Sequence, residues 1–254
     1  MKKSSKLLAG AISALVLLFP ATATFALDDN DKAEIRKIIR SYLLENPELM
    51  LEVQQALEAK QQQQAKEQAR LALVENHKEI FESENQANVG NLNGDVTVVE
   101  FFDYNCGFCQ RAMDDMNVLL SIDPNIKFVM KELPILSPGS VEASRVSTAV
   151  YRNYPDKYLE FHNRLLGLQG EKNGERALEI VESLEMDRGI IEQMAGEESV
   201  VDTFRENNRL ATSLGINGTP SYVIGDEVIF GALGHQVLKS KIDNVRKCGS
   251  TVCS

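Results

Sequence analysis

Three hydrophobic patterns follow one another along the chain. An apolar segment covers residues 7–20, apolar residues at helical spacing recur along residues 28–83, and a strand pattern occupies Val96–Phe102. The last run is rich in β-branched and aromatic residues and is too short for most helices, so it predicts a buried strand. Further strands are predicted at residues 126–130, 221–224 and 228–230, whereas residues 141–214 show only helical patterns.

The segment 28–83 predicts two amphipathic helices. Apolar residues of the first share one face: Ile35, Ile38, Ile39, Tyr42 and Leu43. Asn46 and Pro47 then predict a stop and a new start, with Asn46 as N-cap and Pro47 at the first helical position. The second helix is expected to continue to Phe81. A long apolar stripe has to be buried, either against the rest of the chain or against other copies of it, and we favour a homo-oligomer.

The N-terminus predicts export. Lys2, Lys3 and Lys6 precede the apolar run, which is too short to span a bilayer comfortably. This order predicts a secretory signal peptide cleaved after Ala26, with an uncleaved membrane tether as the alternative. Four cysteines, an even number, fit an oxidising compartment. The net charge of −10 argues against nucleic acid and anionic membrane surfaces as partners.

Candidate chemistry lies directly after the strand at Val96–Phe102. A short turn leads to Cys106 and Cys109 at the start of a helical pattern, and this order is the thioredoxin-like redox arrangement. Unpaired N–H groups at a helix start favour a thiolate on the first sulfur. We therefore expect Cys106 to be the nucleophile and Cys109 the resolving thiol, exchanging through a mixed disulfide. The alternatives are a structural disulfide or half of a zinc site, but we expect no metal.

Two distant features favour the redox interpretation. Glu100 has apolar neighbours in the strand, so desolvation should raise its pKa and make it a proton acceptor for the cysteines. The alternative is an edge-strand carboxylate that faces water. Thr219-Pro220 precedes a short strand, and a proline there is compatible with a cis peptide that frees nearby backbone to pair with an extended substrate. An ordinary trans turn is the more frequent fate of such a pair.

Two lone side chains have weaker interpretations. Lys131, at the end of the second strand, either lies near Cys106 and favours its thiolate or is a solvated loop charge. His162 is expected to be a packing residue of a helix.

A second cysteine pair ends the chain. A helix predicted at residues 234–247 is followed by Cys248 and Cys253, for which we predict a local disulfide that staples the tail. The functional alternative is a shuttle pair that serves Cys106 and Cys109.

Several of these motifs occur together in one known protein family. Glu100, Cys106-Gly-Phe-Cys109, Lys131-Glu132-Leu-Pro-Ile and Thr219-Pro220 resemble the DsbA-like family of bacterial periplasmic thiol–disulfide oxidoreductases. The chain looks most like the branch with extra N-terminal helices, which includes Com1-like and ScsC-like proteins. The resemblance covers roughly residues 91–247.

The resemblance implies a fold and a site. The fold is α/β and thioredoxin-like, with an inserted helical domain and an N-terminal helical oligomerisation region. Cys106 is then the attacking thiol, Glu100 a buried acid and Thr219-Pro220 a cis-proline loop. The strong oxidase of the family has Pro-His between its cysteines, whereas Gly107-Phe108 supplies no imidazole to stabilise the thiolate here.

The expected organisation has five segments. They are a signal peptide (1–26), an N-terminal helical region (27–85), the first part of a thioredoxin-like domain (86–139), an inserted helical domain (140–214), and the second part with the tail (215–254). The helical insert interrupts the strand pattern and should cap the redox site.

The expected function is enzymatic. We predict a periplasmic thiol–disulfide oxidoreductase that forms or isomerises disulfides in cysteine-containing exported proteins, with a redox-active disulfide in place of a cofactor. Gly107, Phe108, Thr219 and Pro220 are expected to contact the substrate. The resemblance suggests a membrane redox partner that reoxidises or reduces the protein. A periplasmic chaperone or copper-binding protein that uses the same cysteines is the alternative.

Overall fold

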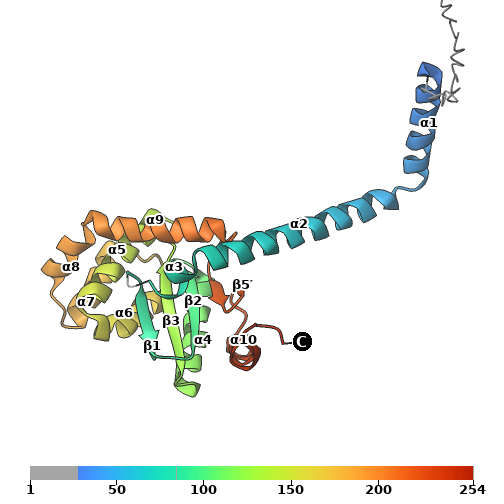
Figure 1. The fold of residues 1–254 in the computed structure, drawn as a ribbon. Helices are drawn as coiled ribbons and strands as arrows, with labels where there is room; N and C mark the ends of the chain where they lie inside the picture. The colour runs from blue at the N-terminus through green and yellow to red at the C-terminus, as the bar shows by residue number, and fades with distance from the viewer. Residues whose placement is uncertain (1–27, 84, 254) are drawn as a thin grey trace, which may run out of the picture. The chain divides into compact units, whose positions relative to one another are not determined.

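The computed structural model describes residues 28–83 and 85–253, in two units (Figure 1). The first unit ends at Glu58 and the second spans Ala59–Ser254, so the boundary falls within one helix. The predicted signal peptide lies outside the described residues. Across the two described ranges, no helix is long and apolar enough to span a bilayer.

The N-terminal unit is built from α1 (Asp29–Glu45) and the first part of α2 (Glu48–Glu75). The Asp28 carboxylate accepts hydrogen bonds from the N–H groups of Asn30 and Asp31, which caps α1 at its start. The predicted break between the helices is confirmed. Asn46, however, closes α1 as its C-cap and does not open α2. The predicted N-cap role was wrong because the Asn46 amide binds the Tyr42 carbonyl of the preceding helix.

Apolar side chains of this unit face outward. No residue of α1 is buried. The large apolar residues exposed on α1 and the first part of α2 are Ile35, Ile38, Ile39, Tyr42, Leu43, Leu44, Met50, Leu51, Val53 and Leu57. The predicted apolar stripe is therefore present.

The second unit is organised by a mixed sheet of five strands. In chain order these are β1 (Ala87–Gly90), β2 (Val96–Phe102), β3 (Ile126–Glu132), β4 (Ser221–Ile224) and β5 (Glu227–Phe230). The spatial order is β1-β3-β2-β4-β5, with β2 parallel to β3 and the remaining pairs antiparallel. The four predicted strands are confirmed. β1 has no counterpart among the predicted strands; pairing with β3 extends this short segment, which its asparagine and glycine residues do not favour as a strand.

Helices cover both faces of the sheet (Figure 1). Their bounds are α3 (His77–Phe81), α4 (Gly107–Ile122), α5 (Pro138–Asn153), α6 (Pro155–Gly167), α7 (Gly174–Ser183), α8 (Arg188–Ala195), α9 (Glu198–Ser213) and α10 (His235–Cys248). Val98 and Phe102 of β2 face the core shared with α4, α5, α6 and α10. Val99 and Phe101 alternate with them and face the core shared with α3, α9 and the end of α2.

The second N-terminal helix is shorter than predicted. α2 ends at Glu75, and α3 begins after Asn76. Ile80 and Phe81 are buried as expected, but Leu71 and Val74 are exposed, because Ala72 and Leu73 take the buried face instead.

Both predictions for Lys131 were wrong. It pairs with Phe101 across the strands, so it lies on the α3 and α9 face of the sheet. Its ammonium is buried, donates to the Glu79 carbonyl at 2.9 Å and lies 3.8 Å from a Glu206 carboxylate oxygen. Burial lowers the pKa of Lys131 to about 8. The residue is neither beside Cys106 nor solvated; it ties α3 to the sheet.

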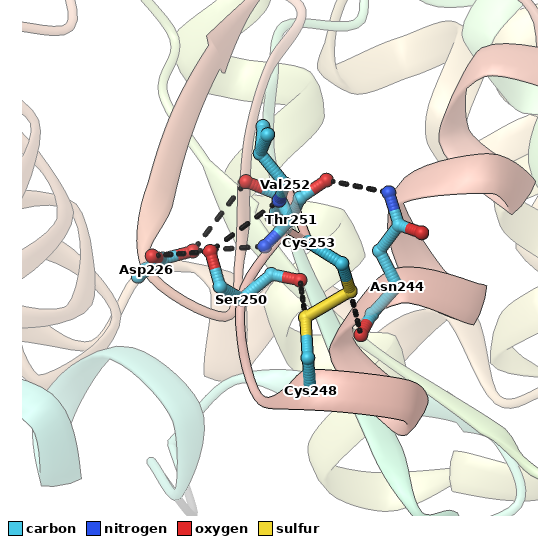
Figure 2. The surroundings of a disulfide bond; sticks show 7 residues. All are labelled: Asp226, Asn244, Cys248, Ser250, Thr251, Val252 and Cys253. Carbon is cyan, nitrogen blue, oxygen red and sulfur yellow. Dashed lines mark hydrogen bonds between the residues drawn. A yellow bond between two sulfur atoms is a disulfide. The ribbon is translucent and has the colours of Figure 1, made fainter.

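The C-terminal tail is fixed at two places (Figure 2). A disulfide joins Cys248 and Cys253. Independently of the sulfurs, Asp226 in the β4–β5 turn accepts hydrogen bonds from Ser250 Oγ at 2.8 Å and Thr251 N at 3.0 Å. The tail therefore contacts both α10 and the hairpin.

Arg246 gives the fold a testable ion-pair network. Its guanidinium donates to Asp95 at 2.8 Å and to Asp123 at 3.1 Å, which ties α10 to the turns before β2 and β3. We expect Arg246→Met to lower the free energy of unfolding by about 1–2 kcal/mol, because the buried Asp123 loses its charged donor. Urea denaturation measures this, with exposed Lys247→Met as the control. Equal stability of the two variants would contradict the prediction.

Candidate active site

A polar turn between β2 and α4 positions the cysteines. Asp103 is fully buried and accepts hydrogen bonds from the N–H groups of Asn105 at 2.7 Å, Ile135 at 2.8 Å and Leu136 at 3.0 Å. One carboxylate thus joins the turn before Cys106 to the loop after β3. Sequence reasoning missed it, although an aspartate at the end of a buried strand was a visible signal.

Asn105 extends this scaffold to the helical insert. Its side-chain oxygen accepts from Lys172 N at 2.7 Å, and its amide donates to Lys172 O at 2.8 Å. This two-point contact fixes the loop between α6 and α7 beside the residue that precedes Cys106. The insert therefore supports the cysteine turn directly.

Cys106 is the N-cap of α4. Its sulfur accepts a hydrogen bond from Cys109 N at 3.3 Å and lies 3.1 Å from the Thr219 carbonyl, to which the thiol donates. The hydrogen bond from the Cys109 thiol is the main cause that lowers the pKa of Cys106 to about 6, and N–H groups of the first helical turn add to it. The lowered pKa favours the thiolate form of the first cysteine.

Cys109 has the opposite character. Its side chain is fully buried, and burial raises the pKa of its thiol far above the usual value; the hydrogen bond to Cys106 and the negative charge of Glu100 raise it further. Both active-site cysteines are free thiols in this structure. The two sulfurs therefore differ strongly in proton affinity although they lie one helical turn apart.

Glu100 lies beneath them in an inner strand. It is 1% exposed, and its cross-strand neighbours are Met130 on β3 and Tyr222 on β4. Burial is the main cause that raises the pKa of Glu100 to about 8, followed by the charges of Asp115 and Cys106. The carboxyl group is buried, as the sequence predicted, so the edge-strand alternative is wrong.

The remaining candidate residues surround Cys106. The Thr219-Pro220 peptide is cis, and the Thr219 carbonyl faces the Cys106 sulfur. Phe108 is 58% exposed, with the Arg111 guanidinium 4.4 Å from its ring centroid. A Cβ at Gly107 would meet no atom within 4 Å, so this side of the cysteine pair is open. The structure thus brings together all four residues that were expected to contact substrate.

His162 is a packing residue, as the sequence predicted. It is buried, its Nδ1 lies 3.2 Å from the Tyr104 hydroxyl, and its ring meets Phe102 edge-on. Burial lowers the pKa of His162 to about 3, so the ring is neutral. No group of three or more histidine, cysteine, aspartate or glutamate side chains with metal-binding geometry occurs in the described part of the chain.

Fold and site together define a class. A capped cysteine thiolate, a buried partner thiol, a buried acid and a cis-proline carbonyl meet at the first helix after the central strand of a thioredoxin-like sheet. This arrangement is that of a thioredoxin-like thiol–disulfide exchange protein.

Comparison with known families makes the class specific. Residues 97–243 match the DSBA-like thioredoxin domain, and the chain belongs to this family of disulfide oxidoreductases. Residues 31–64 match the copper resistance protein ScsC N-terminal domain. The predicted branch, with helices added before the thioredoxin-like domain, is confirmed.

Two solved structures match different lengths of the chain. A thioredoxin-like oxidoreductase from Silicibacter pomeroyi DSS-3 is 37% identical, with a TM-score of 0.64, covering 67% of this chain and 98% of that one. Proteus mirabilis ScsC in a transitional conformation is 26% identical, with a TM-score of 0.64, covering 86% of this chain and 98% of that one.

Curated relatives are more distant. Disulfide bond formation protein D of Bacillus subtilis is 23% identical over 169 residues, covering 63% of this chain and 76% of that protein. The chain spans only 22% of the length of another relative, the Na(+)/H(+) antiporter NhaA 1 of Salinispora arenicola, at 24% identity over 58% of this chain.

The raised pKa of Glu100 predicts a pH-dependent stability. Between pH 4.5, the ordinary pKa of a glutamate, and about pH 8, the folded state keeps a proton that the unfolded state has lost, so stability falls as pH rises. One such group contributes a fall of about 1.4 kcal/mol per pH unit. We expect Glu100→Gln to remove that contribution, which urea unfolding of the reduced protein at several pH values measures. Exposed Glu192→Gln is the control, and an unchanged slope in Glu100→Gln would contradict the prediction.

Proposed function

We propose that the protein is a periplasmic thiol–disulfide oxidoreductase that forms and isomerises disulfides in exported proteins through Cys106 and Cys109. The observation that carries the proposal is the asymmetry of the pair. Cys106 has a lowered pKa, keeps 5% of its surface exposed and lies beside the open Gly107-Phe108 surface, whereas Cys109 has no exposed surface and a raised pKa. A nucleophile at the edge of an open surface and a resolving thiol enclosed behind it suit disulfide exchange.

Isomerisation starts from the reduced pair. The Cys106 thiolate attacks one sulfur of a substrate disulfide; a Cys106–substrate bond forms, and the other substrate sulfur leaves as a thiolate. That thiolate then attacks a different substrate disulfide or returns to displace Cys106. If neither occurs, Cys109 gives up its proton and attacks Cys106, which releases the substrate reduced.

Oxidation runs in the reverse direction. A substrate thiolate attacks Cys106 in the Cys106–Cys109 disulfide, and Cys109 leaves and takes up a proton. A second substrate thiolate then attacks the substrate sulfur of the mixed disulfide, so the substrate is oxidised and Cys106 leaves as a thiolate. Because the hydrogen bonds at the start of α4 stabilise that thiolate, they favour the reduced enzyme and make its disulfide more oxidising.

Substrate recognition is assigned to the open side of the site. An extended chain would lie against the cis Thr219-Pro220 peptide, with Gly107 leaving room for its backbone and exposed Phe108 contacting apolar side chains. Proteins with unfolded, cysteine-containing segments fit such a surface. The redox-active disulfide serves in place of a cofactor, and a membrane redox partner resets its oxidation state.

The N-terminal helices are assigned to self-association. They expose a series of apolar side chains that includes Ile38, Ile39 and Tyr42, and the segment matches the ScsC N-terminal domain. Burying these side chains against other copies of the chain removes them from water. An oligomer would present several cysteine sites to one misfolded substrate, which suits isomerisation.

Reactivation of a model protein with scrambled disulfides tests the activity. In a glutathione buffer we expect the protein to restore the model enzyme's activity and Cys106→Ser to restore none. Cys109→Ser should accumulate a mixed disulfide, because no resolving thiol remains. The variant Cys248→Ser, Cys253→Ser is the control and should keep full turnover; loss of turnover would support the shuttle alternative instead. If the wild type neither isomerises nor oxidises substrates but binds Cu(I), the proposal is wrong.

A charge placed in the apolar stripe tests self-association. We expect Ile38→Glu with Tyr42→Glu to convert an oligomer into a monomer, because buried carboxylates oppose association. Light scattering gives the mass. Isomerase activity should fall severalfold while oxidation of a dithiol peptide persists.

The matched control changes the adjacent polar pair of the same helix. Lys37→Glu with Ser41→Glu has the same spacing and should leave the mass unchanged. A wild-type protein that is already monomeric would refute this part of the proposal without touching the redox chemistry.

A further inference from the structure

Arg111 is an exposed cation on the active-site helix that the proposed chemistry does not use. It lies on α4, two residues after Cys109. Its guanidinium carbon is 4.4 Å from the centroid of the Phe108 ring, and Phe108 is 58% exposed. A Cβ at Gly107 would meet no atom within 4 Å, so the surface next to this pair is open. A cation stacked on an aromatic ring therefore lies beside the surface from which a substrate reaches Cys106.

The direction of the Arg111 side chain follows from helix geometry. Side chains on a helix lean toward its N-terminus, so a residue lies over the one three positions before it. Arg111 is thereby directed to Phe108 and to the start of α4. Asp114 and Asp115 follow further along the same helix, and the Asp115 carboxylate accepts from His235 N at 2.7 Å. The guanidinium thus points toward the redox end of the helix and away from these carboxylates.

The Arg111 guanidinium has no acceptor among the described residues. Within residues 28–83 and 85–253 its contact is with the Phe108 ring, and it forms no hydrogen bond or ion pair there. Every other arginine of the second unit donates at least one hydrogen bond. A cation near the start of a helix is not favoured by the helix dipole either. Local stabilisation therefore does not account for this residue, and its N–H donors are available to a ligand.

The charge of Arg111 differs from its surroundings. Lys172, whose backbone binds Asn105 in the cysteine turn, is only 7% exposed and offers little surface to a ligand. The net charge of −10 repels acidic ligands from the molecule as a whole. An acidic segment is therefore attracted to this site only through a cation that touches it, which Arg111 supplies.

We propose that Arg111, held by Phe108, recognises an acidic residue next to the substrate cysteine. This role rests on the proposed disulfide exchange and decides which cysteine-containing segments react fastest. Arg111 follows Cys106 by a helical rise of about 7.5 Å, and residues of an extended chain are roughly 3.3–3.6 Å apart. A glutamate or aspartate one or two residues from the attacked cysteine is thus within reach. The guanidinium binds a carboxylate through two parallel hydrogen bonds, and the ring beneath it limits the freedom of this fork.

Peptides that carry a pyridyl disulfide on their single cysteine isolate this recognition. The Cys106 thiolate attacks the peptide sulfur, and a Cys106–peptide bond forms. The bond between the peptide sulfur and the pyridyl sulfur breaks, and pyridine-2-thiolate leaves with the electron pair and takes a proton from solvent. Release of the absorbing pyridine-2-thione gives the rate constant of the attack. The full-length protein is used with the Cys248–Cys253 disulfide in place, so the tail contributes no thiol.

Four such rate constants form a double-mutant cycle. They combine the wild type and Arg111→Met with peptides that have glutamate or glutamine beside the cysteine. We expect the glutamate-to-glutamine ratio to be about threefold higher in the wild type than in Arg111→Met, the size of an exposed ion pair. High salt should remove this difference, because it screens the pair. Arg111→Lys should keep part of it, since the charge remains but the fork is lost.

A matched control removes the same charge elsewhere. Lys247 adjoins Arg246, whose contact with Asp123 lies at the far end of α4 from Cys106, so Lys247→Met should keep the wild-type ratio. A purely structural role of Arg111 would lower the rates of both peptides by one factor and leave the ratio unchanged. An unchanged ratio in Arg111→Met would overturn the proposal. Absence of thione release with both peptides in the wild type, at the level of Cys106→Ser, would instead refute the disulfide exchange itself.

Discussion

The alternation of side chains along β2 is the constraint on which the rest of the structure depends. Because neighbouring residues point to opposite faces of a sheet, Val98, Glu100 and Phe102 face α4, while Val99 and Phe101 face α3 and α9. A shift of one residue would move the acid to the other side of the sheet, away from the cysteines. The apolar neighbours that make β2 a buried strand thus also fix which carboxylate lies beneath the redox pair and raise its pKa.

Polar contacts hold the turn after β2 and thereby fix the position of the cysteines relative to this strand. Asp103 joins this turn to the loop after β3, and Asn105 joins it to the loop after α6. Each contact is buried or half-buried, where an unsatisfied donor or acceptor is costly. The helical insert is therefore part of the active-site framework, although it contributes no residue to the cysteine motif.

Much of this arrangement could be read from the sequence because its causes are local. The β2 pattern, the C-x-x-C at a helix start and the proline before β4 each depend on residues close together in the chain. The existence of β1 and the sheet face on which Lys131 lies could not be predicted. Both depend on how β3 pairs with its neighbouring strands, and residues distant in the chain decide that pairing. Asn46 was assigned to the wrong helix, since capping of either neighbour satisfies the same pattern. The link between Asp115 and His235 joins helices 120 residues apart, and no local signal announces it.

The charges of Glu100 and Cys106 are coupled in a way that suits the order of the reaction. While Cys106 is a thiolate, its charge helps to raise the pKa of Glu100, so the acid keeps its proton and adds no second negative charge to the buried site. Once Cys106 has formed a mixed disulfide, that contribution is gone, and the pKa of Glu100 moves downward, while burial and the charge of Asp115 continue to raise it. The direction of this change favours ionisation of Glu100 at the step in which Cys109 has to lose its proton. The two acidic groups are therefore coupled through their charges, with burial as the larger influence on Glu100 throughout.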